Sequence, residues 1–495
     1  MSIKSQSTQV MTDLATLERD YEEFENKRTR RNRGNQEIIS FHFGQSGAQL
    51  ASPIWELYCL EHGINLDGSV SNTSEIQEND TNRKILFSET QNSGYVPLAY
   101  IADDDDQSID QIKDGQLKKL FSTKFLQEFK GDSGSIWASS YKNAQASEIF
   151  RNQIQQLLDK CDSLQGIMIY HSVSGGFGGS YASYLLNEFE DDFSKVIKST
   201  VSLLSSDQSS TSTIVEPYNS VFTINQLKQY SNFNIFIDNS ALSQVCERQL
   251  DIDWANFGIL NKMIAQMIAS ITSTQRLNSE NFVDLQDMYQ NLVTLPELQF
   301  LHTSYAPFIQ RDKQNSQSFN LLQISQALFN EAGSFIKFTP SPSQYFGVNL
   351  FYRGDCSYSD LQGTINELKN SRCINFADWV PINYQVALSS KSTIQFHNTE
   401  LGRVNKTASL VANSTRILNP LKNIQSRFKN LYQKKCFIHW FLKNSQMEES
   451  QFVNGLDFFS SLISNYEQSI SQYINQEKQN VEDESSIEDV EEINK

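Results

Sequence analysis

Two segments of the chain share one pattern, in which a short apolar run leads into a glycine-containing loop and then a helical pattern. IISFHF (38–43) leads into GQSG and ASPIWELYCLEHG, and GIMIY (166–170) leads into HSVSGGFGGS and YASYLLNEFEDDF. Alternation of this kind predicts a mainly parallel sheet that helices cover on both faces. Ligands of such sheets bind at the carboxyl ends of the strands. We therefore expect the two glycine loops to face one crevice.

Other segments extend this α/β pattern. LQFLHTSYAPFIQ and SLVANSTRILNP mix strand and helix signals, and the last 60 residues before the C-terminal tail predict two long helices. Pro53 interrupts the first helical pattern, because an interior proline removes a backbone hydrogen bond and clashes one turn back. We expect this helix either to kink or to begin its regular part at Pro53.

The loop SGGFGGS (174–180) stands between a strand and a helix start, where backbone N–H groups and the helix dipole can hold a phosphate. A tight turn without a ligand is the alternative. Asp103–Asp106 could hold a magnesium ion, since hard cations take carboxylate oxygens, or could form an exposed acidic turn. The chain lacks GxxxxGK[ST] and GxGxxG, a paired-histidine zinc motif and a recognisable nucleophile set.

Charge and composition narrow the class of protein. The 495 residues carry 41 basic and 58 acidic side chains, a net charge of −17, which argues against nucleic acid as a partner. VEDESSIEDVEEINK at the C-terminus predicts a flexible acidic tail. Six separated cysteines and the absence of an N-terminal apolar run indicate reduced thiols in the cytoplasm, and no apolar run is long enough to span a membrane.

The first 36 residues differ from the rest. Leu14, Leu17, Tyr21 and Phe24 lie on one face of a predicted short helix, and KRTRRNR (27–33) follows it. A solvated helix and linker is one interpretation, and an arm that binds a partner is the other.

Motifs along residues 36–473 resemble those of the tubulin family, and specifically its α-type. They are GQSGAQ (44–49), WELYCLEHGINLDG (55–68), LFSET (86–90), HSVSGGFGGS (171–180), VEPYNS (215–220), IDNSAL (237–242), LDIDWANFGILN (250–261), FVDLQDMYQNL (282–292), TSYAPF (303–308), LFYRGD (350–355), FADWVP (376–381) and FIHWFL (437–442). The first helix sequence, the long loop between Ala387 and Ala408 and a carboxylate at Asp287 favour the α-type over the β-type.

The resemblance implies a domain order. It consists of a charged N-terminal extension (1–36), a parallel-sheet GTP-binding domain (37–238), an α+β intermediate domain (239–414), a C-terminal helical hairpin (415–473) and an acidic tail (474–495). It also implies a heterodimer with β-tubulin, head-to-tail protofilaments, and contacts of the C-terminal helices and tail with microtubule motors and associated proteins. The expected location is the cytoplasmic cytoskeleton, in microtubules of the cell body, a cilium or another specialised array.

The family's site residues carry over by position. GTP phosphates and Mg²⁺ would contact Gln45, Asp105 would hold a magnesium-bound water, and Ser212 would lie near the ribose. The remaining phosphate-binding positions are Ser172, Gly175, Gly176, Phe177, Gly178 and Gly179.

At the other end of the nucleotide, Asn239 and Asn261 would hydrogen-bond guanine, and Phe257 would stack on it where the family usually has tyrosine. Asp287 would lie in the next subunit's site and orient the water that attacks the β-tubulin nucleotide. The chain's own site would then bind GTP without hydrolysing it.

Several positions depart from the family pattern. Ser174 and Phe177 replace a glycine and a threonine of the GGGTGSG loop, and Ser135 replaces a phosphate-contacting asparagine. Asp105 and Asp287 are one methylene shorter than the family's glutamates, and a catalytic group displaced by ~1 Å can lose ~100-fold in rate. Ser74 replaces the acetylated lysine, and the chain ends in lysine rather than tyrosine, so neither modification is expected.

These features leave three hypotheses. The first is a divergent α-type tubulin that binds GTP and serves as a structural subunit of microtubules. The second is a tubulin-fold regulator with a decayed nucleotide site that caps or sequesters tubulin, and Phe177, Ser174 and the N-terminal arm motivate it. The third, an unrelated nucleotide-dependent enzyme, has no acid–base set to support it. The Phe177 ring could either damage the loop or lie beneath it while backbone amides still hold phosphate.

Overall fold

The structure is a computed structural model that describes residues 36–469, except for 71–80, 91–93, 131–133, 206–212, 278, 315–318, 339–342, 372–373, 383, 397–398 and 446. The predicted N-terminal helix and basic segment, Ser74, Ser212 and the acidic tail therefore lie outside the described residues.

One sheet joins twelve strands of the described chain in the order β5-β4-β1-β6-β7-β8-β10-β14-β11-β13-β9, with β12 paired to β11. Every neighbouring pair from β5 to β10 is parallel, while β14 runs antiparallel to both β10 and β11. The strands are β1 Glu37–Phe43, β4 Ala99–Asp103, β5 Leu126–Glu128, β6 Leu164–Ser172, β7 Ile197–Leu204, β8 Phe233–Asp238, β9 Ser279–Asn281, β10 Phe300–Ala306, β11 Gln344–Gly354, β12 Asn375–Phe376, β13 Tyr384–Ser389 and β14 Lys406–Ser414. A separate antiparallel pair consists of β2 Phe87–Glu89 and β3 Tyr95–Pro97. The predicted mainly parallel sheet is confirmed.

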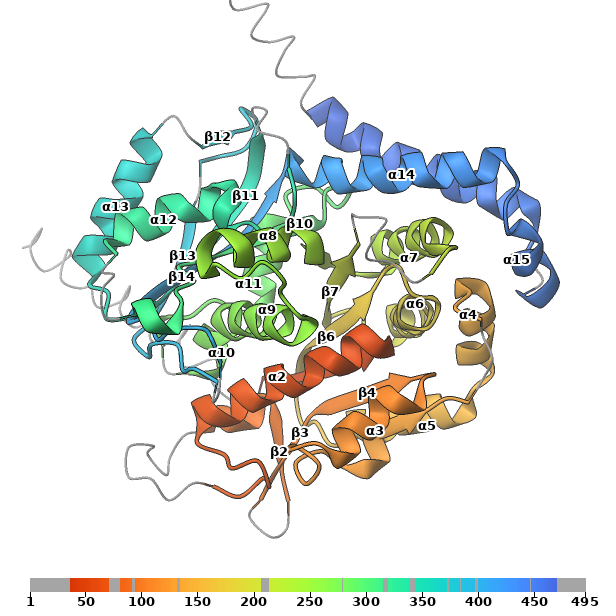
Figure 1. The fold of residues 1–495 in the computed structure, drawn as a ribbon, viewed down its shortest axis with the longest axis horizontal. Coiled ribbons are helices and arrows are strands. Elements are labelled where there is room, and N and C mark those ends of the chain that lie inside the picture. Colours follow the sequence, from red (N-terminus) through yellow and green to blue (C-terminus); the bar gives the residue numbers. More distant parts are fainter. Residues whose placement is uncertain are drawn as a thin grey trace, which may run out of the picture.

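Helices cover both faces of this sheet (Figure 1). They are α2 Gly44–His62, α3 Asp106–Asp114, α4 Trp137–Ala146, α5 Glu148–Leu158, α6 Gly176–Asp192, α7 Glu216–Tyr230, α8 Asn239–Leu250, α9 Phe257–Ile271, α10 Ser273–Arg276, α11 Leu285–Leu292, α12 Leu321–Phe329, α13 Tyr358–Asn370, α14 Leu418–Gln433 and α15 Ile438–Ser445. Neighbouring strand residues point to opposite faces, so Ile38 belongs to the core with α2 and α9, and Ile39 to the core with α6 and α7. The sheet is thus the middle layer of three.

The expected boundaries at residues 238 and 414 coincide with the ends of β8 and β14. However, the sheet continues across the first of them, because β10 pairs in parallel with β8. The division into domains stays a prediction.

Pro53 does not delay the start of the first helix. Helix α2 runs from Gly44 to His62 with Pro53 inside it and buried. The expectation that the regular helix begins at Pro53 is therefore wrong. The N-terminal part is held by close packing, since a Cβ on Gly47 would come within 2.5 Å of the Tyr170 carbonyl oxygen.

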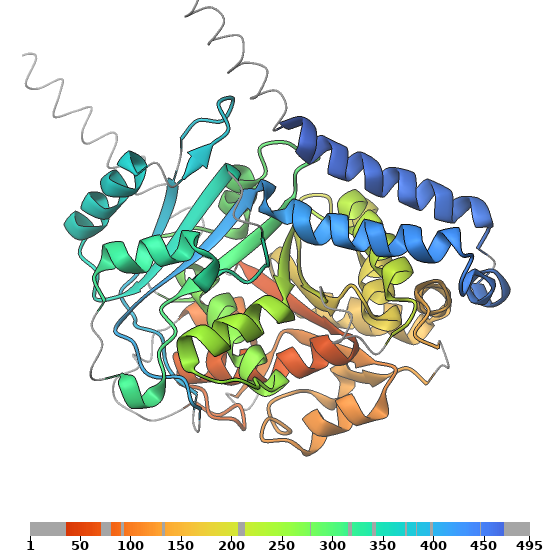
Figure 2. The ribbon, with the colours of Figure 1, turned by 45° about the horizontal axis from the view of Figure 1, so that its top comes forward.

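The C-terminal region contains three helices in its described part, rather than the two long ones that the sequence predicts. After α14, Lys435 and Phe437 adopt positive φ angles of 48° and 60°, which end the helix before the short α15 begins. A third helix spans residues 449–469 and lies antiparallel beside α14 (Figure 2). The Gln425 amide donates to the Ser460 hydroxyl across this pair. Among the described helices, none has the length and apolar character needed to cross a bilayer.

Candidate functional site

A cavity of about 530 Å³ opens at the carboxyl ends of β1, β4, β6 and β7, which is a volume typical of small-molecule sites. Ten of the predicted site residues line it: Gln45, Asp105, Ser172, Gly175, Gly176, Phe177, Gly178, Asn239, Phe257 and Asn261. The two glycine loops do face one crevice, as the parallel sheet predicts. Gly179 lies beneath the cavity against Thr223, and Ser212 lies outside the described residues.

The first turn of α6 forms one wall of the cavity. Gly175 is the N-cap residue, so the first backbone N–H groups of the helix have no partner within it. A Cβ placed on Gly175 would meet no atom within 4 Å, which shows that the loop is open at this position. Unpaired amides at a helix start, together with the helix dipole, suit a phosphate group.

The next glycines allow close packing between the loops. A Cβ on Gly176 would lie 2.3 Å from the Ser135 carbonyl carbon, and one on Gly178 would lie 2.8 Å from the Phe43 carbonyl oxygen. Gly44, which begins α2, has a φ of 74°, a conformation that side chains with a Cβ rarely adopt. These residues bring the two glycine loops and the Ser135 loop into contact around the cavity.

The Phe177 ring packs into the core beneath the loop. The residue is 5% exposed, and its ring stacks on Tyr181 with centroids 4.0 Å apart. Phe129 flanks the same ring at 6.1 Å. Of the two interpretations of this substitution, the structure supports the one in which the ring fills apolar space and leaves the backbone amides available.

Ser174 also fits the loop. Its hydroxyl lies 2.7 Å from that of Ser172, whose hydroxyl donates to the Leu203 carbonyl oxygen at 3.3 Å. The hydroxyl groups of Ser172 and Ser174 thus lie in the part of the cavity next to the first turn of α6. The neighbouring His171 is fully buried, and burial lowers its pKa to about 4, so it stays neutral beside Ser202.

The opposite end of the cavity is formed by the starts of α8 and α9. Asn239 begins α8 and Asn261 lies in the second turn of α9. The Asn239 Oδ1 atom is buried without a hydrogen-bond partner in the protein, which leaves an acceptor for a ligand N–H group. Phe257 is 58% exposed at the start of α9, where its ring offers a flat face to a base.

Asp103, Asp104 and Asp105 of the acidic cluster all line the cavity. Asp103 is 1% exposed, and burial raises its pKa to about 7, while its Oδ2 atom has no hydrogen-bond partner. Asp105 caps α3 by accepting from the Gln107 N–H group, and it lines the cavity. Among the described residues, no group of three or more histidine, cysteine, aspartate or glutamate side chains could hold a metal. Carboxylate oxygens are the type of ligand that a magnesium ion takes.

Asp287 lies apart from the cavity. It is the third residue of α11 and forms a capping box with Asp284, whose Oδ1 atom accepts from the Asp287 N–H group at 2.6 Å. The Asp287 side chain is half-buried, so part of it reaches the surface. The structure thus does not bring Asp287 to the chain's own site.

Sequence reasoning missed some residues that line the cavity. Gln49 follows Gln45 by four residues on α2 and lies on the same helix face, a spacing that could have revealed it. Ser46 and Thr213 also line the cavity, and neither belongs to a pattern that distinguishes it from other polar loop residues.

Comparisons with known proteins agree with this geometry. Residues 37–247 match the family model described as Tubulin/FtsZ family, GTPase domain, and residues 296–426 match the one described as Tubulin C-terminal domain. The fold and site therefore define a GTPase-type protein of the tubulin/FtsZ class.

Curated relatives narrow the assignment. They include the tubulin alpha-1B chain of Physarum polycephalum, the tubulin alpha chain of Dictyostelium discoideum and the tubulin alpha-3 chain of Zea mays, which are 32%, 33% and 31% identical. Each alignment covers 87% of this chain and 96% of the relative. The chain belongs to the tubulin family, its similar relatives are α-tubulins, and GTP binding is the property that this family implies.

Proposed function

We propose that this protein is an α-type tubulin subunit that binds GTP with Mg²⁺, pairs with β-tubulin and assembles head to tail in microtubules. The observation that carries the proposal is the cavity itself. It has unpaired helix amides at one end and the unpartnered Asn239 oxygen beside the Phe257 ring at the other. Phosphates suit the first end, and the N–H groups of guanine suit the second.

The bound nucleotide would be held and oriented by the chain's own residues. The α6 amides with Ser172 would bind phosphate oxygens, and Asn239 with Asn261 would accept from or donate to the base. When bound, Mg²⁺ would supply positive charge to the phosphates, with Asp105 and Gln45 beside it. Among the described residues, the cavity lining includes three carboxylates, Asp103, Asp104 and Asp105, but no histidine or lysine, which suits binding better than hydrolysis.

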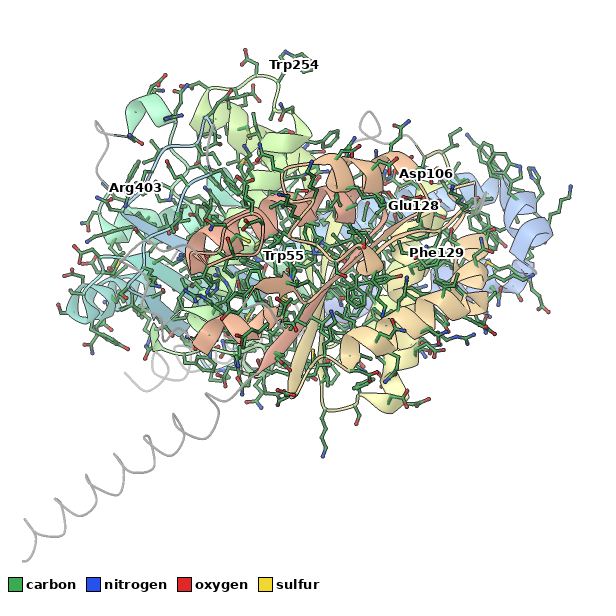
Figure 3. The ribbon with its side chains drawn as sticks, turned by 90° about the horizontal axis from the view of Figure 1, so that it is seen from below. Trp55, Asp106, Glu128, Phe129, Trp254 and Arg403 are labelled. Carbon is green, nitrogen blue, oxygen red and sulfur yellow. The ribbon has the colours of Figure 1, made fainter. Side chains whose placement is uncertain are left out.

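A partner subunit would cover the surface around Trp254 and Phe257. Trp254 is 93% exposed and projects from the surface (Figure 3), and Phe257, which lines the cavity, is 58% exposed. Exposed aromatic residues of this kind are enriched at the centres of protein interfaces. We assign this surface to the β-tubulin contact within the heterodimer. A head-to-tail contact repeats without closing and so builds a filament.

In the filament, Asp287 would act on the nucleotide of the neighbouring β-tubulin subunit. Its side chain in α11 is partly exposed, although its Oδ2 atom accepts from the Asp284 N–H group at 3.3 Å, and it would orient the water that attacks a neighbouring β-tubulin nucleotide. The C-terminal helices would face motors and associated proteins, since α14 and residues 449–469 lie side by side on the surface (Figure 2). The cytoskeleton follows from this role, and a cilium is one array in which to look for it.

The regulator with a decayed site is less well supported. It requires that Phe177 and Ser174 disrupt the loop, yet the ring of Phe177 is buried against Tyr181 and Ser174 is hydrogen-bonded to Ser172. The amides of the loop keep their place at the cavity in this arrangement.

The test is the nucleotide content of the protein co-purified with β-tubulin. Denaturation should release two guanine nucleotides per heterodimer, one of them GTP that resists exchange during a chase with labelled GTP. A single, fully exchangeable nucleotide would contradict GTP binding by this chain, and failure to co-purify with β-tubulin would contradict the subunit role.

A further inference from the structure

Asn219 joins three segments around the nucleotide cavity although it does not line the cavity itself. It lies in α7 and is 0% exposed. Its Oδ1 atom accepts from the Trp137 backbone N–H group at 3.1 Å, and its Nδ2 atom donates to the carbonyl oxygens of Ser135 at 2.8 Å and Ser174 at 3.2 Å. One buried amide thus uses both its donor and its acceptor atoms on the main chain of other segments.

The contact with Trp137 supplies a cap that α4 lacks. The N-cap residue of α4 is Ile136, whose side chain has no oxygen to accept from the first turn. Asn219 provides that oxygen from a different helix, so the start of α4 is tied to α7. Ser135 directly precedes Ile136, the N-cap of α4, and belongs to what we call the Ser135 loop. The position of this loop therefore depends on where α4 begins.

The two carbonyl contacts reach the loops that face phosphate. Ser135 and Ser174 both line the cavity, and they come from segments 39 positions apart in the sequence. Ser135 has a φ of 56°, which is costly for a residue with a Cβ and needs support from its surroundings. Gly176 presses against Ser135 from the other loop. The Asn219 amide therefore holds the two loops against each other.

We propose that Asn219 is a positioning residue that sets the spacing of the Ser135 and Ser174 loops and thereby slows nucleotide release. This inference rests on the proposed GTP binding and assigns part of it to a side chain outside the cavity. Without the amide, the Ser135 and Ser174 carbonyl groups lose a shared donor. The loops can then separate, and the α6 amides no longer face phosphate in a fixed geometry.

Asn225 provides a matched control. It is an asparagine on the same helix, is 9% exposed, and donates from Nδ2 to the Gly455 carbonyl oxygen at 2.8 Å. Its contact anchors the C-terminal helix rather than the nucleotide loops. Asn219→Ala and Asn225→Ala each remove a buried amide from α7, so both should lower the thermal unfolding temperature.

The experiment measures release of labelled GTP from the full chain in its heterodimer with β-tubulin, during a chase with unlabelled GTP. Asn219→Ala removes three hydrogen bonds, two of them to the nucleotide loops, and should speed the slow release phase about tenfold or more, while Asn225→Ala should leave it unchanged. Equal release rates in the two variants would overturn the positioning role. A wild-type heterodimer that holds neither slowly released nor exchange-resistant GTP would instead contradict the proposed GTP binding.

A second variant separates the helix cap from the loop contacts. Asn219→Asp has nearly the same volume and keeps an oxygen for the Trp137 N–H group, but it cannot donate to either carbonyl oxygen. We expect it to release GTP at least as fast as Asn219→Ala. Release at the wild-type rate would show that the loop contacts do not matter and would overturn the proposal.

Discussion

The Phe177 ring stacks on Tyr181 within α6, with ring centroids 4.0 Å apart and planes 25° from parallel. Phe177 stands where the family's loop usually has a threonine. Because residues four apart on a helix lie on one face, its ring contacts Tyr181 in the core. The aromatic ring is therefore packed in the core, although Phe177 also lines the cavity. The sequence left two interpretations of Phe177 open, a damaged loop or a ring beneath it, and the stacking on Tyr181 supports the second.

Phe177→Ala should destabilise the fold without abolishing nucleotide binding. Loss of a buried ring leaves a cavity and costs about 3 kcal/mol in the free energy of unfolding. Urea denaturation measures this cost, and the nucleotide count per heterodimer measures binding. Tyr181→Phe is the control, since it keeps the stacked rings. A Phe177→Ala protein of normal stability that has lost its GTP would show that the ring contacts the nucleotide.

Asn239→Ala should weaken GTP binding by about 10- to 100-fold, because a buried acceptor for the base is removed. Equilibrium competition with labelled GTP gives the affinity. Asn256→Ala is the matched control, since Asn256 is the exposed N-cap of α9 and accepts from the Ile259 N–H group. That change should cost about 1 kcal/mol of stability and leave the affinity unaltered. Equal losses of affinity in both variants would argue against base recognition by Asn239.

Asp287→Asn should slow GTP hydrolysis by the β-tubulin partner during assembly by about 100-fold or more, because a neutral amide cannot orient and polarise the attacking water as a carboxylate does. Phosphate release from polymerising mixtures measures the rate. The asparagine keeps the capping position in α11, so polymer formation itself should continue. Asp287→Glu, which restores the length found in the family, should be at least as fast as the wild type. Unchanged hydrolysis in Asp287→Asn would remove the catalytic role.

Glu61 forms a buried ionic network that joins α2 to distant segments. Its Oε2 atom lies 2.5 Å from Arg276 Nη2, and its Oε1 atom lies 2.7 Å from Arg353 Nη2, with all three side chains at most 1% exposed. Glu61→Gln leaves positive charge uncompensated in the core and should cost about 3–5 kcal/mol. Urea denaturation of Glu467→Gln is the control, since the Lys422–Glu467 pair is half exposed and should matter little.

The contribution of Glu61 should also depend on pH. Burial is the largest single influence and raises the pKa of Glu61, but the combined attraction of Arg276 and Arg353 outweighs it and holds the pKa below its ordinary value. A lowered folded-state pKa gives stability that is present above the unfolded value of about 4.3 and is lost as the pH falls through the folded value. The stability difference between wild type and Glu61→Gln should be constant near neutral pH and narrow in acid. A difference that widens in acid would contradict this assignment.

Local patterns in the sequence were sufficient to predict the parallel sheet and the site at its edge. Strand and helix periods and glycine loops are short-range features, and each depends on neighbouring residues. The same patterns misjudged Pro53 and the C-terminal helices. Packing of Gly47 against Tyr170 holds α2 together before the proline, and positive φ angles at Lys435 and Phe437 divide a region whose helical period looks continuous.

The sequence by itself determined the two strand–loop–helix units of a mainly parallel sheet, the polar groups available to a nucleotide and the family to which the chain belongs. Only the tertiary structure decided where the Phe177 ring points, that Asn219 ties two loops together, and that Glu61 meets Arg276 across 215 positions of the chain. The reason is physical. Such contacts depend on how the helices pack across the folded sheet. The local periodicity of apolar residues carries no information about the distance between residues that are far apart in the sequence.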